Sequence, residues 1–221
     1  MIIGLGHKKQ VGKDTVANII CSLNTKFEKK SFAHKLKQIA SILFNVPIEK
    51  WEDPEFKERI IGYGEEKLIN GVNTREGITP RTILQKIGEI LRNNLYENVW
   101  VNALLNASML KPAEASYEEG TEGETIQDSI ACGITTVKKE LPDWIITDVR
   151  YKNEAEAIKS LGGILIKVDR ETGYKDNHIS ETALDDYQDW DYVIDNNGTL
   201  EELIDKVKEL YDRTEGFRVF K

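Results

Sequence analysis

The chain begins with MIIGLGHKKQVGKDT, residues 1–15, which joins an apolar run to a polar turn containing glycine and lysine. Apolar residues then recur at helical spacing, at Val16, Ala17, Ile19 and Ile20. The order strand, loop and helix is the context that a phosphate-binding P-loop requires. We therefore predict a loop that turns its N–H groups toward an anion, followed by a helix that points its positive end at the same place.

The loop departs from the P-loop pattern G-x-x-x-x-G-K-[ST] at two positions. The first glycine of the pattern falls at His7, with Gly6 one residue early, and Asp14 follows Lys13 where a hydroxyl is usual. Thr15 brings the hydroxyl one position later. Asp14 either holds Mg²⁺ through water or favours the positive helix terminus. An ordinary strand-to-helix turn is the alternative, but the strand, the loop and the helix together favour a P-loop.

The composition limits the classes of function. The 221 residues carry a net charge of −8, and 40% of them are hydrophobic, which is typical of one substantial α/β core with appendages. The acidic balance argues against general binding to nucleic acid, although a local group of cations can still bind a small anionic substrate. Cys21 and Cys132 lack metal-ligand spacing, so we expect reduced thiols in a cytoplasmic protein. The sequence enters an apolar strand directly and has no apolar run of membrane-spanning length, so we expect no signal peptide and no membrane association.

Hydrophobic periodicity and turn residues predict the order of elements. We expect helices over residues 13–23, 39–44, 55–61, 80–92, 100–105, 153–161 and 199–211, and further strands over residues 27–32, 144–148, 164–168 and 191–195. Residues 48–79 are predicted to be a polar, irregular excursion, and residues 113–128 an acidic, flexible loop. Because no linker separates two domains, we predict one domain over residues 1–221 with a substrate-binding excursion around residues 48–110.

Charged residues follow the predicted strands at the edge where parallel sheets bind ligands. Asp148 ends one strand with Arg150 just past it, and Asp169 and Arg170 end another. In P-loop enzymes an Asp at such a strand end lies beside the phosphates and assists Mg²⁺. A structural salt bridge is the alternative for each pair, but two pairs favour a shared site. Lys35, after a third predicted strand, either faces a substrate phosphate or is solvated.

The helix that starts at Pro80 carries polar residues at steps of three and four, which places them along one side. These residues are Arg81, Gln85, Gly88 and Arg92. Two arginines around a glutamine and a glycine suit a phosphate and a base edge, although an ordinary solvated helix face has the same spacing. Further along, His178 and Glu181 are more typical of a capped helix start than of a catalytic pair.

Four stretches carry a resemblance to a known family. They are Gly12-Lys13-Asp14-Thr15; Arg81 through Gln85 with Gly88; Thr147-Asp148-Val149-Arg150 with Asn153-Glu154; and His178-Ile179-Ser180-Glu181 with residues 195–202. In this order, and over most of the chain, they resemble the deoxynucleoside monophosphate kinases of tailed phages, distant relatives of adenylate and thymidylate kinases. His7 and the acidic loop over residues 113–128 are the departures from the family pattern.

The resemblance implies a P-loop NTPase fold, which is an α/β three-layer sandwich with a mostly parallel sheet. It implies a reaction in which ATP and a deoxynucleoside monophosphate give ADP and the diphosphate for DNA precursor synthesis. ATP and Mg²⁺ are the implied cofactors, and small nucleotides are the implied partners. The family also suggests a homodimer, located in the host cytoplasm if the protein is encoded by a phage. A lid must exclude water, and residues 171–177 and 48–79 are the two candidates.

The resemblance also implies roles for individual residues. ATP binding falls to Gly6, His7, Gln10, Val11, Gly12, Lys13, Asp14 and Thr15; monophosphate binding to Lys35, Arg81, Gln85 and Arg92; catalysis to Lys13, Asp148, Arg150 and Arg170; and Mg²⁺ binding to Asp14 and Asp148. Phosphoryl transfer needs in-line positioning and neutralisation of charge more than covalent chemistry, which is compatible with this set.

Two other functions use the same strand, loop and helix. One is a kinase of another small phosphorylated metabolite, which differs in its acceptor. The other is a nucleotide-binding switch ATPase, which hydrolyses ATP slowly without an acceptor and needs a partner surface. The arginines at positions 81, 92, 150 and 170 favour an acceptor phosphate.

Overall fold

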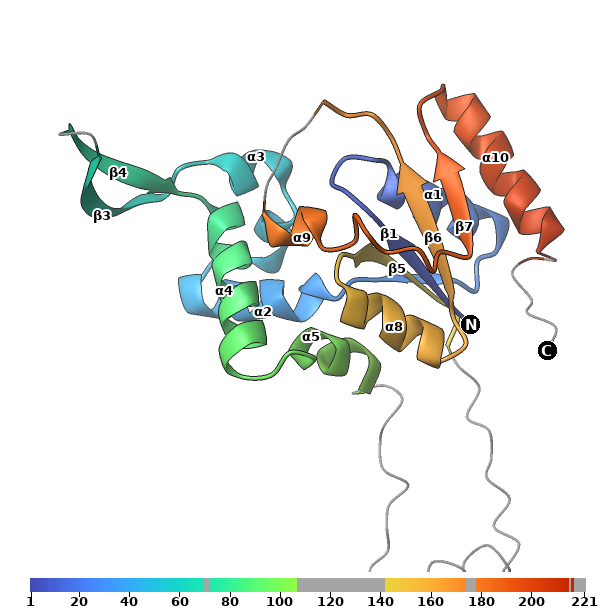
Figure 1. Ribbon diagram of the computed structural model, residues 1–221, viewed down its shortest axis with the longest axis horizontal. Coiled ribbons are helices and arrows are strands. Elements are labelled where there is room, and N and C mark those ends of the chain that lie inside the picture. The colour runs from blue at the N-terminus through green and yellow to red at the C-terminus, as the bar shows by residue number, and fades with distance from the viewer. Residues whose placement is uncertain (70–71, 107–141, 174–177, 215, 217–221) are drawn as a thin grey trace, which may run out of the picture.

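The computed structural model describes residues 1–69, 72–106, 142–173, 178–214 and 216. At its centre lies a five-stranded sheet in the order β2-β5-β1-β6-β7, in which every neighbouring pair is parallel (Figure 1). The strands are β1 (Ile2–Gly6), β2 (Glu28–Lys30), β5 (Trp144–Val149), β6 (Ile164–Asp169) and β7 (Tyr192–Asp195). The predicted α/β fold with a parallel sheet is therefore confirmed.

Two apolar layers, one on each face of the sheet, hold the fold together. Ile3 of β1 belongs to the core beneath α1 (Lys13–Leu23) and α10 (Leu200–Arg213), whereas its neighbour Ile2 belongs to the core beneath α8 (Lys152–Ser160). Because both faces of β1 are covered, its sequence is a continuous apolar run instead of an alternating one. The P-loop follows this central strand and is thus anchored in the most buried part of the molecule.

A group of helices, which we call the helical arm (residues 33–58 and 80–94), lies beside the sheet in Figure 1. It contains α2 (Ala33–Phe44), a 3₁₀ helix (Ile48–Trp51), α3 (Pro54–Glu58) and α4 (Pro80–Asn94). A small core of Ala40, Trp51 and Ile83 joins these helices. α4 starts where the sequence predicts, because the Thr79 hydroxyl accepts a hydrogen bond from the Thr82 N–H and proline occupies the first helical position.

The predicted irregular structure is wrong for the second half of residues 48–79. β3 (Gly62–Ile69) and β4 (Val72–Ile78) form an antiparallel hairpin that projects from the helical arm (Figure 1). Tyr63 is largely exposed, and the cross-strand pair of Glu66 and Arg75 is also exposed. Because neither face of the described part of this hairpin is buried, the alternation of apolar and polar residues that identifies most strands is absent.

The remaining described elements are short. They are α5 (Val99–Val101), a π-helix (Asn102–Asn106) and α9 (Ile179–Thr182). The acidic loop predicted over residues 113–128 lies outside the described residues, and the division into one domain with a substrate-binding excursion stays a prediction. In the described part of the chain, no helix has both the length and the apolar composition needed to cross a membrane.

Candidate active site

The loop after β1 has the curled backbone of a phosphate-binding loop. His7, Gln10 and Gly12 all have positive φ, at 94°, 64° and 98°. A Cβ on Gly12 would also collide with the side-chain amide of Asn196, which is buried and donates to the carbonyl oxygen of Val11 at 2.8 Å. Gly12 therefore has two reasons to be glycine, whereas His7 holds a backbone conformation that glycine adopts at less cost.

Gly6, which lies one residue before the first glycine position of the P-loop pattern, lets β1 pack closely against Trp190. A Cβ on Gly6 would collide with the ring of Trp190, so the strand can approach that ring only with glycine there. The His7 side chain is buried, with Nδ1 3.4 Å from Asp169 Oδ1. Burial lowers the pKa of His7, the positive charge of Lys167 lowers it further, and Asp169 opposes both. The imidazole is therefore neutral at pH 7.

Lys13 lies at the start of α1 with only 7% of its surface exposed. Its ammonium donates to the carbonyl oxygen of His7 at 3.0 Å and to that of Lys8. Burial lowers the pKa of Lys13 to about 8, and Arg150 lowers it as well, while Glu181, Asp14 and Asp148 raise it. A buried cation held by loop carbonyls can exchange those oxygens for the oxygens of a phosphate at little cost in reorganisation.

Glu181 of α9 connects the loop to Arg150. One carboxylate oxygen accepts the Lys9 backbone N–H at 2.7 Å, and the other pairs with the Arg150 guanidinium. The Glu181 side chain is 7% exposed and that of Arg150 26%. The predicted capped helix start is also present, because His178 Nδ1 accepts the Ser180 N–H at 3.2 Å. Glu181 was not predicted to be a site residue, although the stretch His178-Ile179-Ser180-Glu181 is one of those that carry the family resemblance.

Asp148, at the end of β5, holds the start of α2. Its two oxygens accept the Ser31 hydroxyl at 2.7 Å, the Phe32 N–H at 2.8 Å and the Ala33 N–H at 2.9 Å. A carboxylate that accepts the first N–H groups of a helix stabilises its positive end. Asp148 therefore fixes the helical arm to the sheet, and its predicted part in catalysis and Mg²⁺ binding stays a prediction.

Arg92 is buried between α4 and α8. Its guanidinium donates to Glu154 at 3.0 Å and to the Asn153 side chain at 3.2 Å, and it lies 3.5 Å from the centre of the Tyr151 ring. Glu154 also accepts the N–H groups of Arg150 and Tyr151. Burial raises the pKa of Glu154 to about 7 against the opposing charge of Arg92. These contacts make Arg92 a link between two helices, which the spacing along α4 alone does not show.

Arg81, at the start of α4, pairs with Glu58 at the end of α3. Arg81 Nε lies 2.7 Å from Glu58 Oε1, and Lys9 Nζ from the P-loop lies 3.4 Å from the same oxygen. The structure thus brings a predicted substrate-binding arginine and a loop lysine to one anionic group. Glu58 was not assigned to the site from the sequence, and Lys9 was predicted only as part of the phosphate-binding loop, with no individual role.

The other predicted residues make fewer contacts. Within the described ranges, the side chains of Asp14, Lys35, Gln85 and Arg170 make no hydrogen bond or ion pair; Gln85 is half-buried, and the other three are exposed. Asp14 follows Lys13 in the first turn of α1, and Arg170 follows β6 at the same edge of the sheet as Arg150. These positions leave all four side chains available to a ligand.

The fit of this site to Mg²⁺ depends on Asp14 and Asp148. The negative charges of both carboxylates raise the pKa of Lys13. No group of three or more His, Cys, Asp or Glu side chains that could hold a metal occurs among the described residues. One or two carboxylates near bound phosphates are the usual protein contribution to a Mg²⁺–nucleotide site, so the residues present fit the ion.

A parallel sheet, a curled loop with a buried lysine and arginines at the strand ends define a phosphotransferase of the P-loop class. The profile of the deoxynucleotide monophosphate kinase family matches residues 126–207. An Acanthamoeba polyphaga mimivirus protein named "Putative deoxynucleotide monophosphate kinase" is 30% identical over 213 residues, which cover 96% of each chain. This chain belongs to the deoxynucleotide monophosphate kinase family, whose reaction is the phosphorylation of deoxynucleoside monophosphates.

Two phage proteins support the same assignment. The deoxynucleotide monophosphate kinase of Enterobacteria phage T4 is 42% identical over 160 residues, which are 71% of this chain and 55% of the phage protein. That of Escherichia phage RB69 is 37% identical over 68 residues, which are 30% of this chain and 28% of its own length. The family predicted from the sequence is therefore confirmed.

Proposed function

We propose that this chain transfers the γ-phosphoryl group of ATP to the phosphate of a deoxynucleoside monophosphate. An oxygen of the acceptor phosphate forms the new bond to the γ-phosphorus, the bond to the β-phosphate oxygen breaks, and ADP leaves. Family membership supports the reaction, and the placement of Lys13 and Arg150 at one edge of the sheet supports the residue roles. The buried Lys13, at the start of α1, carries this proposal.

The donor half of the site is the loop with the start of α1. Lys13 exchanges the carbonyl oxygens of His7 and Lys8 for phosphate oxygens when ATP binds. The loop N–H groups face the same phosphates because three positive φ angles curl the backbone around them. The proposed ATP contacts are Gly6, His7, Gln10, Val11, Gly12, Lys13, Asp14 and Thr15.

Arg150 and Arg170 contact the transferring group from the ends of β5 and β6, the two strands that flank β1. Glu181 positions Arg150 and, through the Lys9 N–H, the loop. One buried carboxylate thus fixes the relative position of the phosphate-binding loop and an arginine. Such preorganisation is what stabilises charge that develops during phosphoryl transfer.

The acceptor half is the helical arm. Arg81 binds the monophosphate, and the unpaired side chains of Gln85 and Lys35 supply further contacts. Arg92 was predicted to bind the same substrate, but its buried pairing with Glu154 favours a different role. We propose that Arg92 positions α4, and with it Arg81 and Gln85, against α8.

Asp14 and Asp148 are the residues that would hold Mg²⁺. When bound, the ion would neutralise charge on the ATP phosphates. Water must also be excluded, and residues 48–79 and 171–177 are the proposed lids, of which residues 70–71 and 174–177 lie outside the described residues. The predicted homodimer and cytoplasmic location rest on the family resemblance, and light scattering on the purified protein tests the first.

The acceptor is tested directly by mixing the protein with Mg²⁺-ATP and each common ribo- or deoxyribonucleoside monophosphate. ADP formation that depends on selected deoxynucleoside monophosphates is the expected result, and it also defines the base preference. ADP formation that ignores every acceptor would contradict the proposal and favour a switch ATPase. ATP binding without ADP formation would point to a different phosphorylated acceptor.

A further inference from the structure

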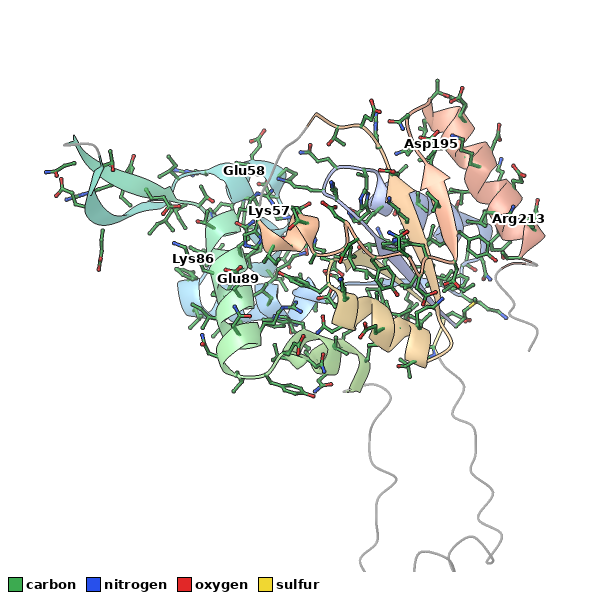
Figure 2. All side chains as sticks on the ribbon, in the orientation of Figure 1. Lys57, Glu58, Lys86, Glu89, Asp195 and Arg213 are labelled. Carbon is green, nitrogen blue, oxygen red and sulfur yellow. The ribbon has the colours of Figure 1, made fainter. Side chains whose placement is uncertain are left out.

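Glu58 connects two elements that must cooperate in the reaction. Its Oε1 atom accepts Arg81 Nε at 2.7 Å, lies 2.6 Å from the terminal guanidinium nitrogen of Arg81, and lies 3.4 Å from Lys9 Nζ. Arg81 belongs to α4, and Lys9 belongs to the P-loop. Figure 2 shows Glu58 on α3, between the hairpin and the sheet. One carboxylate oxygen therefore sits where a cation from each half of the site converges.

Several cations lie around Glu58 and the neighbouring carboxylate, Glu52. Glu52 pairs with Lys37 at 2.7 Å and lies 4.0 Å from Lys57. Burial lowers the pKa of Lys57, and the charges of Lys37 and Arg81 lower it further, while Glu52 and Asp14 oppose them. The cations that contact Glu58 itself are Arg81 and Lys9, and these two can bind another anion in its place.

Arg81 and Lys9 stabilise the ionised form of the Glu58 carboxylate. Partial burial would raise the pKa of Glu58, but the hydrogen bond and charge of Arg81 and the charge of Lys9 leave it lowered overall. The side chain is 57% exposed, so water can replace its contacts and the pair is inexpensive to break. A phosphomonoester dianion offers more charge and more acceptor oxygens to the same cations than one carboxylate does.

The position also matches the reaction. Lys9 is fixed at the loop, because its N–H donates to Glu181 at 2.7 Å, and its side chain is only 14% exposed. An anion that contacts both Lys9 and Arg81 lies beside the donor phosphates, as an in-line acceptor must. We propose that in the ligand-free enzyme the Glu58 carboxylate occupies the position of the acceptor phosphate, which displaces it and binds Arg81 and Lys9. This inference rests on the proposed function.

Displacement of Glu58 has a structural consequence. Glu58 is the last residue of α3, and β3 follows only a few residues later. Losing the bond to Arg81 removes this ion pair between α3 and α4, while Phe56 of α3 still packs against Trp51. The same event that fills the site therefore removes one polar contact that holds the end of α3, next to the hairpin.

The variant Glu58→Gln tests the competition, because it keeps the size of the side chain and removes its charge. With dAMP, dCMP, dGMP and dTMP as acceptors, KM for the monophosphate should fall about two- to fivefold, the most that an exposed ion pair contributes. KM for ATP should not change. Glu52→Gln is the matched control: Glu52 is equally exposed at 57% and pairs with Lys37, so KM for the monophosphate should stay the same.

A second variant keeps the test decisive. In the Arg81→Ala background, the decrease in KM for the monophosphate caused by Glu58→Gln should be at most half as large. The reason is that Arg81, for which Glu58 and the acceptor phosphate compete, is absent. A rise in KM for the monophosphate in Glu58→Gln would mean that Glu58 orients Arg81 and would overturn the inference. No change in that KM, or a change in KM for ATP alone, would also overturn it. Failure of the proposed function is distinct, since the wild-type protein would then show no acceptor-dependent ADP.

Discussion

The donor and acceptor halves of the site are built differently. Around the P-loop, Lys13 and Glu181 are almost completely buried, and their partners are backbone groups and the Arg150 guanidinium, which is 26% exposed. On the helical arm, Arg81 and Lys37 pair with Glu58 and Glu52, which are each 57% exposed. Buried pairs are costly to break, whereas exposed pairs exchange with water and ligands.

This difference indicates a division of labour. The donor half is preassembled, because ATP phosphates carry charge that must be met by donors already in place. The acceptor half is held by replaceable contacts, which suits a site where a substrate must bind and a lid must close after it. Variants of the donor half should therefore affect kcat, and variants of the acceptor half should affect KM for the monophosphate.

The largest effect is expected for Lys13→Ala. Removing a buried cation that contacts transferring phosphates should lower kcat by about 10²- to 10³-fold or more. Steady-state ADP formation measures it, with circular dichroism to show that the fold is kept. Lys8→Ala is the control in the same loop, since the Lys8 side chain points to Asp185 and should leave kcat nearly unchanged. Full activity of Lys13→Ala would remove the P-loop assignment.

Arg150 and Glu181 should act as one unit. Arg150→Ala is expected to lower kcat about 100-fold, and Glu181→Gln about tenfold, with smaller changes in KM for ATP. If Glu181 works through Arg150, the effect of Glu181→Gln should largely disappear in the Arg150→Ala background, as a double-mutant cycle of kcat values would show. Fully additive effects would assign Glu181 to the loop alone.

Arg81→Ala should act on the acceptor. We expect KM for the monophosphate to rise about tenfold or more, because hydrogen bonds to charged groups contribute roughly 1.5–3 kcal/mol. KM for ATP should stay within about twofold, since Arg81 lies on the helical arm. Initial rates over a grid of both substrates separate the two constants. A change in KM for ATP alone would mean that the two halves are misplaced.

The smallest effect concerns stability. Burial raises the pKa of Glu154 to about 7 in the fold; Arg92 on α4 and the Arg150 N–H oppose this rise, and Asp148 on β5 adds to it. The folded chain then binds more protons than the unfolded chain above the ordinary pKa, so this contribution to stability is lost as pH rises toward 7. Relative to Glu154→Gln, the wild-type unfolding free energy should fall by about 2 kcal/mol between pH 5.5 and pH 8.

Urea unfolding of both proteins at the two pH values measures this difference. The comparison with Glu154→Gln cancels the titration of all other groups. An equal stability difference at both pH values would mean that Glu154 stays ionised beside Arg92 throughout.

Much of the fold was predictable because local sequence and burial agree. The helix over residues 13–23 was predicted with the bounds that α1 has, and the strand and helix order after Trp144 was predicted as well. These elements have strong apolar periodicity against the two cores. The hairpin over residues 62–78 was missed because none of its described side chains is fully buried and its sequence carries no such periodicity.

The site was predictable to the extent that its residues follow a strand or a glycine. Lys13 and Arg150 were found in this way. The residues that were missed are Glu181, Asn196 and Glu58. Their partners lie 172, 185 and 23 positions away in the sequence, and such long-range contacts cannot be inferred from a single sequence. The partner of Arg92 was missed for the same reason.

The most direct test of the account is the fate of the γ-phosphate. The protein is incubated with Mg²⁺ and ATP labelled at the γ-phosphate, with and without each deoxynucleoside monophosphate, and the labelled products are separated. The account predicts label in the deoxynucleoside diphosphate for the wild-type protein, little label in inorganic phosphate, and neither product for Lys13→Ala. Label that appears only in inorganic phosphate, at a rate independent of the acceptor, would contradict it.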